Sequence, residues 1–556
     1  MTSGDEANES LSENSPLLAQ RSGKSDDGAI HSSQRPDPQH HPPDDDTPIA
    51  EEPTTGKLLL VMGSIWFGCF FAALDSTIIA TLSAPISASF HSLSLLSWLA
   101  SAYLIANAAL QPLSGRLTDI LGRRAGLIFS NVFFAAGNLI CGLAQDEWTI
   151  ILGRVVAGMG GGGLTAISTI VGSDLVPLRK RGLWQGFANI CYGIGAALGG
   201  VFGGWINDVW GWRIAFLIQV PLTVISGILI FFTVHIPVKP SDQSAWKRID
   251  FLGALTLIST LVLLLLGINS GGNIVPWTSP LVLVSLPLSA VSLVVFIIIE
   301  ANYAAEPVIP VRLLMDRTVL SACLTNWFTT MCYFSILFYA PIYFQVKGLS
   351  TTAAGARLIP ASAGVAIGSV ASGLIMRKTG RYYYLSITVQ LIFLISLAIY
   401  TSFQLNTASW QPVLAFLLSG FGYSGMLTIT LLAVIAAVAH ADQAVITSAS
   451  YAFRSTGSTI GIAIASAVFQ NILGRKLQSR FAGLPGSDDE NKYVGRLRDS
   501  LEEIGKLPPG LKEDAMDCYM DALRGVFLTT LGIGVVGAAV SLAMREHVLH
   551  SNLARK

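Results

Sequence analysis

Fourteen long apolar stretches constrain this chain more than any other feature of its sequence. A helix that crosses a bilayer needs about 20 mainly apolar residues, and 52% of the chain is hydrophobic while only 13% is charged. The sequence predicts spanning helices near 57–81, 95–115, 125–144, 148–172, 182–206, 212–235, 250–270, 278–300, 318–345, 352–376, 382–402, 411–438, 443–472 and 523–544. The expected fold class is an all-α polytopic membrane protein.

The basic residues of the short loops indicate the orientation. Most of them lie in loops on the amino-terminal side, at Arg116, Arg123, Arg124, Arg179, Lys180, Arg181, Lys239, Lys247, Arg248, Arg312, Arg317, Arg377, Lys378 and Arg381. The opposite short loops offer little beyond Arg213 and Lys347. Because short cytosolic loops are enriched in Lys and Arg, we expect both termini in the cytosol.

The first 56 residues differ in composition from the rest. Residues 1–56 are rich in Ser, Asp, Glu, His and Pro, so we expect a disordered cytosolic tail without a cleavable signal peptide. Within it, Glu13 and the pair Leu17 and Leu18 resemble an acidic dileucine sorting signal. Such a signal would bind clathrin adaptors on the way to a lysosome-like compartment, and a chance match is the alternative.

A short motif occurs twice. Gly115, Asp119, Gly122 and Arg123 recur with the same offsets as Gly373, Arg377, Gly380 and Arg381. A shared spacing after helices two and ten predicts two homologous halves. The expected parts are an amino-terminal six-helix bundle at 57–235, two linking helices and loops at 236–317, a carboxy-terminal six-helix bundle at 318–544 with a long non-cytosolic loop at 473–522, and a cytosolic carboxy terminus at 545–556.

The first copy of this motif lies in residues 115–124. Gly115 and Gly122 allow close backbone approach, while Asp119, Arg123 and Arg124 can form charge-assisted hydrogen bonds. The loop resembles signature A of the major facilitator superfamily, which implies a gate that closes one face of the protein. A basic loop that only sets topology is the alternative.

Two charged residues interrupt apolar helices. Arg154 lies in a segment that resembles signature B of the same superfamily, where the arginine is linked to proton coupling, and Asp75 lies in one that resembles the first-helix signature of fourteen-helix proton antiporters. A buried charge needs a partner, and the two residues have comparable depths. We expect a pair that opens and closes as Asp75 gains or loses a proton. Alternatively, either side chain reaches the interface.

Helix five carries the small residues Gly195, Gly199, Gly200, Gly203 and Gly204. The segment resembles signature C, which is characteristic of antiporters, although Gly200 replaces the usual proline. Such residues let helices pack closely and let a helix bend. Plain close packing is the alternative.

The candidate substrate-binding residues are Asp75, Asn107 and Arg454. Arg454 lies near the middle of helix thirteen, where a cation faces a wet cavity or a partner. It would suit a substrate carboxylate, and a structural role is the alternative. For Asn107, an interhelical hydrogen bond is the competing role.

The segments 98–113 and 173–182, together with signature A, resemble those of fungal vacuolar basic amino acid transporters and their close relatives, and the resemblance covers most of residues 60–225. The resemblance implies a major facilitator fold of two six-helix bundles plus two linking helices. It also implies a proton-coupled antiporter that moves amino acids, basic ones (Arg, Lys and His) in particular, from the cytosol into the vacuole. The alternatives are a plasma-membrane multidrug or toxin efflux antiporter and a non-transporting nutrient receptor.

The absence of an ATP-binding motif indicates how transport would be driven. No GxxxxGK[ST] segment occurs, so the chain is not expected to hydrolyse ATP, and a proton gradient is the expected source. The six cysteines show no metal-binding spacing. We expect a small-molecule substrate and protons as partners, and no enzyme activity, cofactor, metal or nucleic acid.

Overall fold

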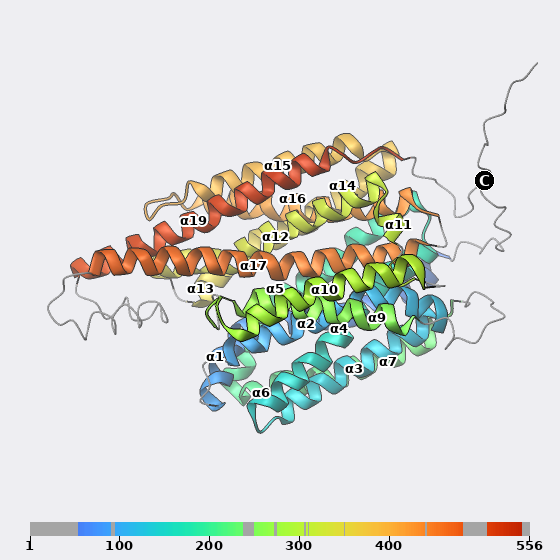
Figure 1. The fold of residues 1–556 in the computed structure, drawn as a ribbon, viewed down its shortest axis with the longest axis horizontal. Helices are drawn as coiled ribbons and strands as arrows, with labels where there is room; N and C mark the ends of the chain where they lie inside the picture. The colour runs from blue at the N-terminus through green and yellow to red at the C-terminus, as the bar shows by residue number, and fades with distance from the viewer. Residues whose placement is uncertain are drawn as a thin grey trace, which may run out of the picture. The chain divides into compact units, whose positions relative to one another are not determined.

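Helices make up nearly all of the described structure. The computed structural model describes residues 54–90, 95–236, 250–271, 275–304, 307–309, 311–349, 351–439, 442–481 and 509–547. The helices in Figure 1 are α1 (Thr55–Phe90), α2 (Leu95–Leu121), α3 (Arg123–Leu143), α4 (Glu147–Leu175), α5 (Leu178–Trp210), α6 (Trp212–Leu217), α7 (Gln219–Thr233), α9 (Phe251–Ser270), α10 (Pro280–Asn302), α11 (Val311–Leu314), α12 (Arg317–Val346), α13 (Thr351–Ala356), α14 (Ile359–Thr379), α15 (Tyr383–Thr401), α16 (Trp410–Ala437), α17 (Gln443–Phe481) and α19 (Pro509–Ser541). The dileucine-like residues Glu13, Leu17 and Leu18 lie outside the described residues, so the sorting signal stays a prediction.

The number of spanning helices depends on α2. Among the described residues, 13 helices are long and apolar enough to cross a membrane, and α2 is not one of them. This helix has 27 residues, which is a sufficient length, but Asn107, Gln111 and Arg116 make it less apolar than its neighbours. With α2 the count matches the fourteen stretches in the sequence.

Proline divides two of the predicted helices. The stretch predicted at 212–235 is split into α6 and α7, and the stretch at 352–376 is split into α13 and α14. Pro221 and Pro360 each lie four residues after the last residue of the shorter helix. Since proline lacks an N–H and clashes with the carbonyl four residues earlier, each break occurs where the ladder of hydrogen bonds is lost.

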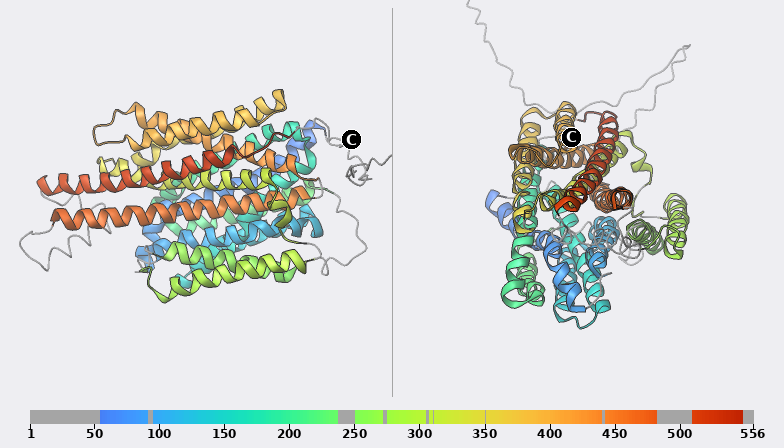
Figure 2. Two further views of the ribbon diagram at one scale, coloured as in Figure 1. Left: turned by 45° about the horizontal axis from the view of Figure 1, so that its top comes forward. Right: turned by 90° about the vertical axis from the view of Figure 1, so that its left-hand side faces the viewer.

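The long loop predicted at 473–522 needs a correction. Helix α17 continues to Phe481 and α19 begins at Pro509, so both helices extend beyond the others at one end (Figure 1 and Figure 2). An apolar stripe continues along the extensions, at Leu473, Leu477, Phe481, Ala515, Tyr519 and Ala522. Two ion pairs flank it, Lys476 with Asp521 at 2.8 Å and Arg480 with Asp514 at 3.1 Å. The helices therefore continue beyond the continuous apolar stretches that set the predicted ends of the loop, because one face of each extension stays apolar.

Two sets of helices pack mainly within themselves. Contacts join α1 to α5, α2 to α4 and α3 to α4 and α7, and we call α1–α7 the first half. Contacts likewise join α12 to α17 and α19, α14 to α16 and α15 to α16, and we call α12–α19 the second half. The linking helices α9 and α10 pair with each other, and α9 also contacts α2. The bundle boundaries drawn from the sequence stay a prediction.

Candidate functional site

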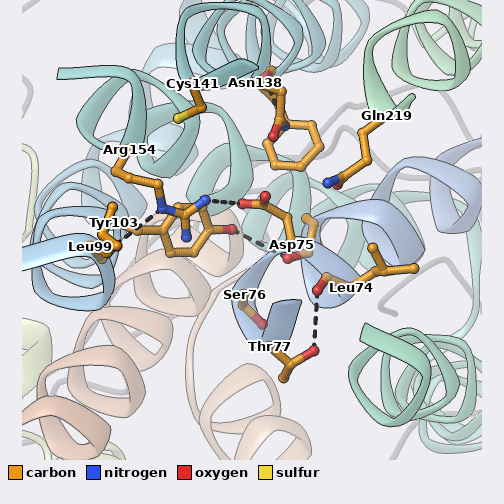
Figure 3. Close-up of polar contacts among 12 residues, drawn as sticks. Leu74, Asp75, Ser76, Thr77, Leu99, Tyr103, Asn138, Cys141, Arg154 and Gln219 are labelled. Atoms are coloured by element: carbon orange, nitrogen blue, oxygen red, sulfur yellow. Dashed lines mark hydrogen bonds and ion pairs between the residues drawn. The ribbon is translucent and has the colours of Figure 1, made fainter. Parts of the chain in front are cut away.

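Asp75 and Arg154 form a buried ion pair between α1 and α4 (Figure 3). Arg154 Nη1 donates to Asp75 Oδ2 at 2.7 Å, and the two side chains are 1% and 0% exposed. Arg154 Nε also donates to the backbone oxygen of Leu99 on α2 at 3.1 Å. This burial is inconsistent with the alternatives that place either side chain at the membrane interface.

The two partners of this pair differ in how well they are satisfied. The Arg154 guanidinium lies 4.4 Å from the ring centroid of Tyr103, in addition to its two hydrogen bonds. Asp75 Oδ1, in contrast, is buried without a hydrogen-bond partner among the described residues, although the Gln219 side chain of α7 interacts with this carboxylate. Because buried polar atoms are normally bonded, the carboxylate is the partner with room for a proton.

Signature C packs α5 against the Asp75 turn of α1. A Cβ added to Gly199 would clash with Thr77 Oγ1 and lie 2.5 Å from the backbone oxygen of Leu74, and one added to Gly195 would lie 2.5 Å from Phe70 O. No atom lies within 4 Å of the Cβ position of Gly204. Gly195 and Gly199 therefore make the close contact, on the turn of α1 that carries Asp75.

Arg123 is the centre of the signature A network. Its guanidinium contacts Asp119 Oδ1 at 2.6 Å and Asp174 Oδ2 at 2.8 Å, and it donates to Thr118 Oγ1 at 2.8 Å. Gly122 has a φ of 95°, which turns the chain between α2 and α3 and brings Arg123 back over Asp119. Asp174, in the last turn of α4, was missed by the sequence interpretation; an acidic residue just before the Pro177 turn was the available signal.

Two other arginines of this loop lie elsewhere. The Arg124 guanidinium is 3.9 Å from the ring centroid of Phe231 on α7, so this residue packs on α7. Arg116 acts electrostatically on Glu300 of the linking helix α10. Glu300 is 6% exposed, and its carboxylate accepts from the backbone N–H of Val308 at 3.0 Å. The loop therefore contacts the first half and a linking helix through different arginines.

Glycines of both motif copies bring the two halves into backbone contact. A Cβ added to Gly115 would lie 2.5 Å from Ser448 Oγ and 2.6 Å from Ala444 O on α17. A Cβ added to Gly373 would lie 2.5 Å from the carbonyl carbon of Gly182 on α5. Both contacts lie at the end of the helices that loop charge predicts to be cytosolic. The structure is therefore closed at that end.

The opposite end shows a different pattern of packing. A hydrophobic cluster around Leu82, Ile86 and Trp212 contains only first-half residues, and one around Tyr343, Tyr400 and Phe527 contains only second-half residues. Nearer the cytosolic end, Leu113 of α2 belongs to a cluster that also contains second-half residues. Side chains of the two halves therefore share hydrophobic clusters toward the cytosolic end.

Arg454 lines a small cavity between the halves. The lining residues come from α5, α12, α16 and α17, and they are Gln185, Asn189, Asn326, Leu427, Leu431, Ser450, Tyr451 and Arg454. Neither Asp75 nor Asn107 is among them. Asn107 instead packs on α4, where a Cβ added to Gly162 would lie 2.8 Å from its backbone oxygen. Of the three substrate candidates, Arg454 is thus the one that lines this cavity.

Comparisons with known proteins agree on the family. Residues 65–466 match the Major Facilitator Superfamily. Among curated proteins, the multidrug resistance protein fnx1 of Schizosaccharomyces pombe is 38% identical over 89% of this chain and 94% of its own length. The vacuolar membrane amino acid uptake transporter fnx2 of the same yeast is 33% identical over 85% of this chain and 82% of its own length. Vacuolar basic amino acid transporter 2 of Saccharomyces cerevisiae is 34% identical over 83% of this chain and 99% of its own length.

Solved structures share the fold at low sequence identity. The human organic anion transporter MFSD10 aligns with a TM-score of 0.57 and 14% identity, covering 87% of this chain and 99% of its own. The proton:xylose symporter XylE aligns with a TM-score of 0.54 and 16% identity, covering 87% of this chain and 95% of its own. These likenesses support the arrangement of helices and not the cargo.

Proposed function

This chain belongs to the Major Facilitator Superfamily, and we propose that it is a proton-coupled antiporter that moves amino acids, basic ones among them, from the cytosol into the vacuole. Family membership makes it a membrane transporter of small molecules and not an enzyme. The vacuolar location and the amino acid cargo are supported by relatives whose names state both. The coupling ion and the direction rest on the geometry of the ion pair.

The single observation that carries the proposal is the buried Asp75 and Arg154 pair, with its 2.7 Å contact. A proton that arrives from the acidic lumen and binds Asp75 neutralises the carboxylate and removes most of its attraction for Arg154. The guanidinium then keeps its contacts with Leu99 O and the Tyr103 ring but loses its anionic partner. Because an unpaired cation inside a membrane span is costly, the contact between α1 and α4 has to rearrange.

Signature C and signature A link this rearrangement to opening. Gly199 of α5 packs on Leu74, so a shift of the Asp75 turn displaces α5. The same helix α5 contacts α14 at Gly182, which is part of the closed cytosolic end. The network around Arg123 holds α2, α3 and α4 together at that end. In the proposed cycle, protons leave the lumen as substrate enters it, and the closed end opens to load the substrate.

The experiment is uptake of labelled arginine, lysine and histidine into vacuolar vesicles that contain this protein. Uptake is measured with and without a proton gradient for the wild type and for Asp75→Asn, with the exposed loop variant Asp146→Asn as a matched control. We expect uptake driven by the gradient in the wild type and the control, and no such uptake in Asp75→Asn. Absence of amino acid uptake by correctly folded wild type would contradict the proposal.

The second candidate is a drug or toxin efflux antiporter at the plasma membrane. It is favoured by the similarity to a protein named for multidrug resistance. The location of a tagged chain separates the two candidates, and Leu17→Ala combined with Leu18→Ala tests the sorting signal in the tail. A tagged wild-type chain at the plasma membrane, together with drug transport, would replace the first candidate.

A further inference from the structure

The cavity between the halves presents one charged side chain, that of Arg454. Its other polar lining groups are amides, the Ser450 hydroxyl and the Tyr451 phenol, and it contains no Asp or Glu. Side chains from both halves meet there, since Gln185 and Asn189 come from α5 while Asn326 and Arg454 come from α12 and α17. A group bound at Arg454 would therefore contact both halves, as cargo in a rocking transporter must.

The guanidinium of Arg454 is surrounded by tyrosines. It lies 5.3 Å from the ring centroid of Tyr451 and 5.8 Å from that of Tyr192. Tyr423 also interacts with it, and the ring of Tyr423 is stacked on Tyr333 with the centroids 3.9 Å apart. In the part of the chain that the structure describes, Arg454 forms no ion pair with a carboxylate. Aromatic faces offset only part of the cost of a cation in a membrane interior, so this site lacks an anion.

We propose that Arg454 binds the carboxylate of the transported substrate, and that this contact, and not recognition of a cationic side chain, selects the cargo. A guanidinium and a carboxylate form paired, parallel hydrogen bonds, which are among the strong polar contacts of proteins. The inference rests on the proposed function and names its substrate class. The class is free amino acids that keep their carboxylate, neutral as well as basic.

The positions of the acidic residues argue against recognition of a cationic side chain. Asp75 is 0% exposed and bound to Arg154, so it is not available to a substrate in this conformation. Asp119 and Asp174 are held by Arg123 at the cytosolic end. A basic side chain in the cavity would meet no carboxylate among the lining residues. Basic and neutral amino acids should therefore compete with each other within about tenfold.

The first test uses competition on the wild-type protein and needs no substitution. Labelled arginine uptake into vacuolar vesicles is measured against unlabelled agmatine, which is arginine without its carboxylate, and citrulline, which keeps the carboxylate and loses the side-chain charge. We expect citrulline to inhibit and agmatine to be weaker by about tenfold or more, because agmatine loses a charge-assisted contact. Agmatine that inhibits as well as citrulline would overturn the inference while the proposed function stands. No amino acid uptake at all would overturn both.

The second test uses variants with a conservative rescue. Arg454→Gln should lower arginine uptake by about tenfold or more, Arg454→Lys should retain part of it with a raised KM, and the exposed α17 variant Arg475→Gln should match the wild type. The decisive readout is discrimination, because a purely structural role would not change it. In the residual activity of Arg454→Gln, citrulline and agmatine should inhibit alike. Unchanged KM and unchanged discrimination in that variant would overturn the inference.

Discussion

The two copies of the repeated motif share their backbone geometry and differ in their charge chemistry. Gly122 and Gly380 both have positive φ, at 95° and 68°, and Gly115 and Gly373 both touch the opposite half. In the first copy, Arg123 is bound by the side chains of Asp119 and Asp174. In the second copy, the acidic position is Arg377 and the equivalent of Arg123 is the exposed Arg381.

The second copy is held instead by the segment that follows α19. The Glu546 carboxylate accepts from the backbone N–H groups of Tyr382 and Tyr383 at 2.8 and 3.0 Å, so it caps the start of α15. The Tyr382 hydroxyl donates to Arg545 O at 2.6 Å. Burial raises the pKa of Tyr382, which keeps this phenol protonated. Both copies therefore share close glycine contacts between the halves, while the charged contact of the first copy is an arginine network and that of the second copy is the Glu546 cap on α15.

The largest expected effect is on the shared feature, the glycine contacts. Gly115→Val and Gly373→Val place side-chain atoms where the backbone of the opposite half lies, so each should lower transport by about tenfold or more. Gly63→Val is the matched control, because no atom lies within 4 Å of its Cβ position. The measurement is substrate flux, together with alkylation of a cysteine that replaces Ser448, which should become more accessible. If only one of the two variants loses flux, the copies are not equivalent in their backbone contact.

The next effect tests the charge difference between the copies. Arg123→Ala removes two ion pairs and leaves two carboxylates facing each other, which should destabilise the closed conformation by about 1–3 kcal/mol. Arg381→Ala changes an exposed residue and should cost less than about 0.5 kcal/mol. Flux and thermal unfolding in detergent measure both. Equal losses in the two variants would show that the second copy also depends on its arginine.

The smallest expected effect concerns the cap on α15. Glu546→Gln keeps the shape of the side chain and removes its charge, so it should lower the stability of the second half by about 0.5–1 kcal/mol. Glu513→Gln, on an exposed position of α19, is the control. The midpoint of thermal unfolding measures the change. If the midpoint falls no further for Glu546→Gln than for the control, the charge of Glu546 does not stabilise the second copy of the motif.

The sequence predicts the fold well where one residue type dominates a long stretch. Apolar runs locate the spanning helices because the bilayer imposes length and composition together. Apolar runs do not locate the helical extensions of α17 and α19. Charged residues such as Lys476 on α17 and Asp521 on α19 interrupt the apolar run, while the facing sides of the two helices stay apolar. The division between α6 and α7 does have a signal in the sequence, because Pro221 removes a backbone donor four residues after Leu217.

The candidate site is only partly readable from the sequence. The approach of Asp75 to Arg154 follows from the cost of two isolated charges at comparable depth. The tyrosines around Arg454 carry weaker signals, because Tyr192 and Tyr423 lie far from it in sequence and tyrosine is common in apolar spans. Only the spacing of Tyr451 and Arg454, three residues apart on one helix face, hinted at this grouping.

Substrate binding and proton coupling at Asp75 can be separated in one measurement. Exchange of labelled for unlabelled arginine without a gradient, and accumulation of arginine driven by a gradient, are measured side by side in vacuolar vesicles for the wild type and Asp75→Asn. We expect the variant to keep exchange and to lose accumulation, because the neutral amide mimics a carboxylate that is permanently protonated. Accumulation by Asp75→Asn at the wild-type level would contradict the assignment of proton coupling to the Asp75 and Arg154 pair.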